Sequence, residues 1–78
     1  MEIHPAALKH GVTEAKIHHA EANAVAYGPA EEDVPGYMVF GPDRSGDLLE
    51  LVIVARAGEE ALVIHAMPMR AKYHHLLP

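Results

Sequence analysis

The sequence predicts a small α+β domain in which helices precede a three-stranded antiparallel sheet. Hydrophobic residues make up 50% of the chain and charged residues 22%, a balance typical of a packed core. Helix-favouring residues dominate the first third, and short runs of β-branched and aromatic residues dominate the second half. A stretch rich in proline, glycine and acidic residues at 28–36 separates these two regions.

Two helices are predicted before the sheet. Pro5 can open the first, which covers Ala6–His10 and is stopped by a glycine. Thr13 is a typical N-cap residue for the second, which runs from about Glu14 to Val25. Apolar residues recur along it at steps of three and four, at Ile17, Ala20, Ala24 and Tyr27. Residues 28–36 are then expected to form the linker from the helices to the sheet.

Three strands are predicted in the second half, at Tyr37–Gly41, Leu48–Ala57 and Ala61–Met67. The connections between them are of hairpin length, so the strands should form an antiparallel meander. One face of the middle strand is wholly apolar, whereas the other is polar at both ends. This alternation predicts helices on one side of the sheet and a partly open second face. Pro68 ends the third strand, and residues 69–77 fit a short C-terminal helix.

The length and composition bound the organisation of the protein. A chain of 78 residues is sized for one domain, so residues 1–78 are expected to carry a single active surface. Domains this small are marginally stable alone, which leaves homo-oligomerisation open. The absence of cysteine excludes a disulfide scaffold and a thiolate zinc site. With no signal-peptide pattern and no apolar run near the ~20 residues that span a bilayer, we expect a cytoplasmic protein without a membrane partner.

The charge is unevenly distributed along the chain. The net charge is −5, and the acidic excess lies between residues 21 and 60. Residues 61–78 carry two cations, Arg70 and Lys72, and no acid. Affinity for a nucleic-acid backbone comes largely from lysine and arginine. If the two ends of the chain meet in space, they would form a cationic patch.

The seven histidines raise the question of a metal site. Four of them form two adjacent pairs, His18 with His19 and His74 with His75. Neighbouring residues on a helix point about 100° apart, so such pairs cannot chelate one ion. No HExxH pattern is present either. We interpret the pairs as solvated helix faces and expect no metal and no other cofactor. A histidine-based metal carrier is kept only as a minor hypothesis.

A second set of side chains matches the needs of metal-independent RNA cleavage. That reaction requires a base for the 2′-hydroxyl proton, cations for the charge on the phosphorane, and an acid for the leaving oxygen. The C-terminal region and the first helix offer suitable groups, namely His65, Arg70, Lys72, Tyr73, Lys9 and His10. A structural interpretation remains open beside this one. His65 also fits a histidine at the core edge satisfied by backbone, and Arg70 and Lys72 fit a solvated helix.

Three segments in order resemble the BrnT-like toxins of bacterial type II toxin–antitoxin pairs. They are Lys9–Val12, Asp43–Val52 and Val63–Tyr73, and the resemblance spans residues 9–75. It implies a small RelE-like α+β fold and an endoribonuclease activity that inhibits translation. It also implies an RNA substrate and a cognate antitoxin of the ribbon-helix-helix type.

The resemblance assigns particular positions of this sequence. The family's Lys-His-Gly segment falls on residues 9–11. Its Ile-x-Ala strand end, with the basic residues that follow, falls on Ile64, Ala66, Arg70 and Lys72. Many members have a strand before the Lys-His-Gly segment, but here only residues 1–4 precede Pro5, so that strand is expected to be almost absent.

Two hypotheses for function follow from the sequence. The first is a toxin that acts as a metal-independent endoribonuclease. The alternative is a non-catalytic protein-interaction module of the same fold, which the net charge of −5 and the methionines at the end of the last strand favour. The sequence leaves open whether the acidic residues 31–33 contact an antitoxin or stay solvated.

Overall fold

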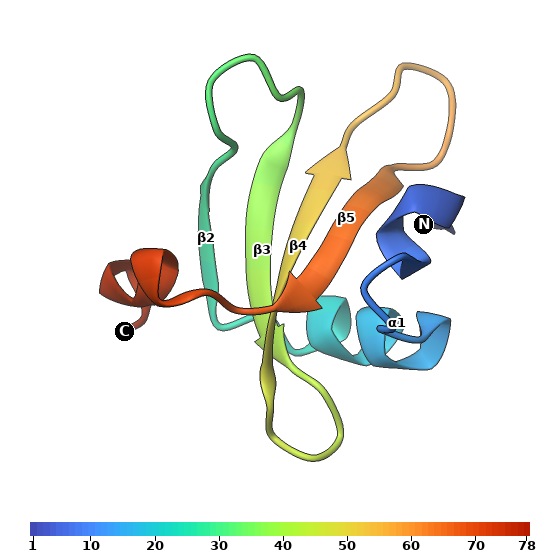
Figure 1. Cartoon of the computed structure of the whole chain (residues 1–78). Helices are drawn as coiled ribbons and strands as arrows, with labels where there is room; N and C mark the ends of the chain where they lie inside the picture. Colours follow the sequence, from blue (N-terminus) through green and yellow to red (C-terminus); the bar gives the residue numbers. More distant parts are fainter.

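The computed structural model describes residues 1–78 and shows an α+β domain built on one five-stranded mixed sheet (Figure 1). The strands are β1 (Glu2–Ile3), β2 (Ala26–Pro29), β3 (Tyr37–Pro42), β4 (Leu48–Val54) and β5 (Leu62–Pro68). Their order in the sheet is β1-β5-β4-β3-β2. β1 runs parallel to β5, and the other neighbours are antiparallel. One α-helix, α1 (Glu14–Ala22), and two 3-10 helices, η1 (Pro5–Leu8) and η2 (Ala71–Leu76), complete the chain.

The predicted three-stranded sheet with two N-terminal helices is therefore wrong, although the α+β class and the meander of β3, β4 and β5 are present. The structure adds a strand on each side of that meander. β1 forms where almost no strand was expected, because Glu2 and Ile3 align with Leu62 and Val63 of β5. Two residues carry no readable alternation, so only the tertiary pairing reveals this strand.

β2 lies between the predicted second helix and the predicted linker, and it takes in the first two residues of that linker. α1 ends at Ala22, and the chain then pairs with β3 from Ala26 opposite Phe40 to Pro29 opposite Tyr37. β2 tolerates Pro29 because it is an edge strand. Proline has no backbone N–H, and at an edge that group can face solvent instead of a neighbouring strand. Gly28 and Pro29, which were expected in the linker, therefore belong to the sheet.

The helical segments are also shorter than predicted. α1 begins after Thr13, whose side chain accepts a hydrogen bond from the backbone N–H of Lys16 at 3.3 Å, as expected of an N-cap. The predicted first helix and the predicted C-terminal helix are both 3-10 segments rather than α-helices. Such tight turns are typical of short connecting pieces. None of the three helical segments has the length and apolar character needed to cross a bilayer.

α1 and η1 cover one face of the sheet and enclose the main core. This cluster consists of Ala7, Val12, Ile17, Ala20, Val39, Leu49, Leu51, Ile53, Val63 and Ala66. The predicted apolar face of the middle strand thus does face the helix. α1 approaches β3 so closely at Gly41 that a Cβ there would lie 2.0 Å from the carbonyl oxygen of Ala20. Only glycine permits that contact.

The opposite face carries a second cluster and receives His65 through an irregularity in β5. The cluster contains Ala26, Met38, Phe40, Val52 and Tyr73. The register of β4 with β5 slips by one residue, because Val52 pairs with His65 but Ile53 pairs with Val63. Val63 therefore points into the main core, while His65 lies on the second face beside Val52. An extra residue of this kind, a β-bulge, commonly re-aims a side chain next to a functional site.

Candidate functional site

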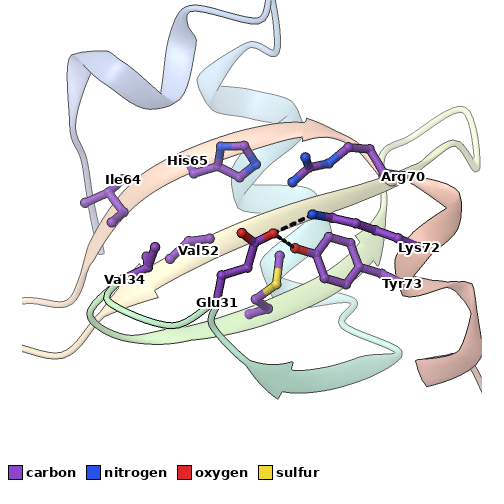
Figure 2. A pocket seen from close by; sticks show the side chains of 9 residues that line it. Glu31, Val34, Val52, Ile64, His65, Arg70, Lys72 and Tyr73 are labelled. Atoms are coloured by element: carbon purple, nitrogen blue, oxygen red, sulfur yellow. Dashed lines mark hydrogen bonds and ion pairs between the residues drawn. The ribbon is translucent and has the colours of Figure 1, made fainter.

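A pocket of about 240 Å³ opens on the second face of the sheet, between the strands, the 30–36 segment and η2 (Figure 2). It is lined by Glu31, Val34, Met38, Val52, Ile64, His65, Arg70, Lys72 and Tyr73. The aliphatic and methionine side chains form an apolar floor, and the charged and polar side chains stand around it. Small-molecule sites commonly combine an apolar lining with a few placed polar groups in this way.

A buried carboxylate, Glu50, holds two of the polar groups in place. It lies in the middle of β4 and is 0% exposed. Its Oε1 accepts hydrogen bonds from the backbone N and the Nε of Arg70 at 2.9 and 3.0 Å. Its Oε2 accepts from Nη2 of Arg70 at 2.7 Å and lies 3.0 Å from Nε2 of His65. The structure leaves no buried polar side-chain atom without a partner, so this network is complete.

These contacts decide the protonation of the network. Burial by itself raises the pKa of Glu50, but the hydrogen bonds from the side chain and backbone of Arg70 and from His65 outweigh it and lower the pKa. The hydrogen bond to Glu50 in turn raises the pKa of Arg70. An ionised carboxylate can only accept, so Nε2 of His65 carries a proton and donates a hydrogen bond to Glu50. The neutral ring then has its lone pair on Nδ1.

A second carboxylate, Glu31, lies at the rim of the pocket. Its Oε1 accepts from Nζ of Lys72 at 2.5 Å and from the hydroxyl of Tyr73 at 2.7 Å, as Figure 2 shows. These two hydrogen bonds lower the pKa of Glu31 from 4.5 to about 2. The hydrogen bond to Glu31 raises the pKa of Lys72, and burial together with the same carboxylate raises the pKa of Tyr73. Tyr73 therefore stays protonated at neutral pH and can act as a donor.

The structure brings four of the predicted site residues together. His65, Arg70, Lys72 and Tyr73 all line the pocket. His65 is bonded to a buried carboxylate rather than to backbone, the alternative that the sequence left open.

The two N-terminal candidates lie elsewhere. The ring of His10 meets the ring of His65 edge-on, with 5.7 Å between the ring centroids, but His10 lines a neighbouring hollow of about 520 Å³. Lys9 is exposed after η1 and lines neither pocket.

The two cations of the C-terminal region are paired with carboxylates. The two ends of the chain do meet, since β1 pairs with β5. Both cations near the pocket are nevertheless paired, Arg70 with Glu50 and Lys72 with Glu31. The carboxylates come from the acidic middle of the chain, and they neutralise the site in this conformation.

Sequence reasoning missed both carboxylates as site residues. A single acid inside the apolar run Leu48–Val54 was a signal for Glu50, because a charge is rarely placed in a strand that is buried on both faces. Glu31 carried no such signal. It is one of three consecutive acids in a segment that appeared to be a solvated linker, and only the fold places it beside Lys72.

The remaining histidines lie apart from the pocket. No group of three or more His, Cys, Asp or Glu side chains converges as metal ligands would. His19 departs from the solvated role assigned to it, because its Nδ1 lies 2.8 Å from the carbonyl oxygen of Pro42. That contact ties α1 to the end of β3.

Comparison of the chain with models of protein families, with curated proteins and with solved structures gave no match.

Proposed function

We propose that this protein is the toxin of a type II toxin–antitoxin pair, as its resemblance to the BrnT-like toxins implies, and that it cleaves RNA without a metal ion. One observation carries the proposal. A histidine oriented by a carboxylate, a guanidinium, an ammonium and a protonated phenol line a single open pocket. Metal-independent cleavage of RNA needs a base, positive charge and an acid within reach of one phosphate.

Each group suits one role in that reaction. Nδ1 of His65 accepts the proton of the 2′-hydroxyl, because Nε2 is held by Glu50. Arg70 and Lys72 stabilise the negative charge that grows on the phosphorane. Tyr73 donates its proton to the leaving 5′-oxygen. The 2′-oxygen forms a bond to phosphorus as the bond to the 5′-oxygen breaks, which yields a 2′,3′-cyclic phosphate and a 5′-hydroxyl.

The partners in this proposal are an RNA substrate in the cytoplasm and a ribbon-helix-helix antitoxin that neutralises the toxin. The net charge of −5 makes general affinity for nucleic acid low. Recognition would therefore depend on the few groups in the pocket rather than on a broad basic surface.

A second candidate is a non-catalytic protein-interaction module of the same fold. Two observations favour it. Both cations of the pocket are already neutralised within the chain. Large apolar side chains are also exposed on β2, β3 and the adjoining segments, namely Val25, Tyr27, Val34 and Tyr37. This candidate predicts binding to a partner protein and no turnover of RNA.

Induction in a bacterial host separates the two candidates when growth and total RNA integrity are followed together. The toxin proposal expects growth arrest with RNA fragmentation, both lost in a Lys72→Ala/Tyr73→Phe variant. A Lys16→Ala/Tyr27→Phe variant removes the same chemical groups outside the pocket and is expected to stay toxic. Normal growth with intact RNA on induction of the unaltered protein would overturn the nuclease proposal in favour of the interaction module.

A further inference from the structure

The carboxylate of Glu31 lies at a position where two hydrogen-bond donors converge, as they would on a bound anion. Two donors, Nζ of Lys72 and the hydroxyl of Tyr73, converge on one oxygen of Glu31. The same oxygen could belong to a phosphate group, because phosphate and carboxylate oxygens accept similar charge-assisted hydrogen bonds.

Packing on the sheet, and not only Glu31, positions the ring of Tyr73. The ring of Tyr73 packs against Phe40 with 5.4 Å between centroids, and it is one of the buried residues of the second cluster. Nζ of Lys72 and the guanidinium of Arg70 lie 5.1 and 5.5 Å from the centroid of that ring. η2 thus carries both donors, and the buried ring of Tyr73 lies beside both cations.

Glu31, in contrast, lies on an exposed segment and can separate from Lys72 and Tyr73. It belongs to a segment beyond the last ladder pair of β2 with β3, and residues 31–36 are all exposed. The side chains of Glu31 and Lys72 are 55% and 50% exposed. Ion pairs in such surroundings contribute little net stability, because water solvates both partners when they separate.

The pocket below this place suits one small unit with an apolar part. Its volume of about 240 Å³ lies below the range of about 300–1,000 Å³ that is common for drug-sized ligands. The floor of Val34, Met38, Val52 and Ile64 offers apolar contact. The Nη1 of Arg70 has no hydrogen bond within the chain and can serve as a third donor, because Glu50 takes only Nε and Nη2.

We propose that this pocket binds one nucleotide of a phosphate-bearing chain, with its phosphate on Lys72, Tyr73 and Arg70, and that Glu31 is an intramolecular competitor which the phosphate must displace. The base lies on the apolar floor. The choice of a nucleotide over other phosphate compounds rests on the proposed function, whereas the competition by Glu31 rests on the geometry alone.

The test is titration of the full chain with cytidine 3′-monophosphate, followed by NMR shifts of the residues that line the pocket. Glu31→Gln is expected to bind about two- to fivefold more tightly than the unaltered protein, the range that the strength of an exposed ion pair implies. Glu32→Gln is the matched control, because it removes the same charge from an exposed neighbour that makes no ion pair or side-chain hydrogen bond. It is expected to leave the affinity unchanged, and Lys72→Ala is expected to weaken it.

Equal affinity of the two glutamine variants would overturn the competition by Glu31. Equal binding of cytidine without its phosphate, or undiminished binding to Lys72→Ala, would overturn the phosphate site. Cleavage of RNA is a separate readout. If the nucleotide binds in the expected pattern while RNA stays intact, the site stands and the nuclease proposal fails. If RNA is cleaved and both glutamine variants bind alike, the nuclease proposal stands and the competition by Glu31 fails.

Discussion

Two carboxylate–cation pairs flank the same pocket, and they differ in almost every physical respect. Glu50 lies in the centre of a strand, is 0% exposed and accepts from three donor atoms of Arg70 as well as His65. Glu31 lies in a surface segment, is 55% exposed and meets two side chains of η2 with one oxygen. The first carboxylate is built into the core of the sheet, whereas the second lies at the surface.

The largest expected effect is the loss of stability in Arg70→Ala. This change leaves the buried carboxylate with only His65 and the backbone N–H of residue 70 as partners. Because the Arg70 side chain is itself 43% exposed, we expect a cost of about 3 kcal/mol, the low end for breaking a buried pair. Small domains have a total stability of about 5–15 kcal/mol, so the variant should unfold at much lower urea concentration. Arg44→Ala, in an exposed turn without an ion pair, is the control. Equal unfolding midpoints for the two variants would contradict a structural role for the buried pair.

A double-mutant cycle sharpens that result. Glu50→Gln keeps the shape of the side chain but removes its charge, and is expected to cost about 1–3 kcal/mol. Arg70→Ala in the Glu50→Gln background should cost less than it does alone, because no buried charge is left unpaired. The coupling energy from urea unfolding is expected at about 0.5–3 kcal/mol. Additive losses would show that the two side chains stabilise the fold independently.

The exposed pair should respond to mutation in the titration of Glu31 and only slightly in the stability of the fold. Lys72→Ala is expected to move the pKa of Glu31 from about 2 back toward 4.5, measured on its side-chain carboxyl carbon by NMR. Because the folded-state pKa is lowered, the pair stabilises the protein above pH 4.5, and this contribution fades as the pH falls toward 2. An unchanged titration in Lys72→Ala would show that another group sets the pKa.

The smallest expected effect is that of salt. At 1 M ionic strength the Debye length is about 3 Å, so exposed charges are screened while buried ones are not. The pKa of Glu31 should therefore rise toward its ordinary value with added salt, while the lowered pKa of Glu50 should change little. A parallel response of both carboxylates would remove the distinction between them.

Part of the fold could be predicted from the sequence because it depends on local signals. The meander of β3, β4 and β5 follows from β-branched runs and turn residues, and the start of α1 follows from the cap at Thr13. β1 and β2 could not be predicted this way. One has two residues, the other contains glycine and proline, and both exist because a neighbouring strand offers its edge.

The candidate site also contains residues that can be grouped from the sequence and residues that only the fold brings together. His65, Arg70, Lys72 and Tyr73 could be grouped from the sequence because they are close in the chain, and all four line one pocket. The bulge that turns His65 to the open face has no local signal, since its register depends on both strands. Glu31 reaches Lys72 across 41 positions of the chain, a pairing that only the tertiary fold creates.

The most direct measurement of the central claim is an assay of the purified protein on RNA in the presence of EDTA, with analysis of the product ends. The account predicts fragments ending in 2′,3′-cyclic phosphate and 5′-hydroxyl groups. It also predicts that Lys72→Ala and Tyr73→Phe, which leave the buried network intact, cleave far more slowly. RNA that stays intact, or cleavage that both variants perform as fast as the unaltered protein, would contradict a nuclease site in this pocket.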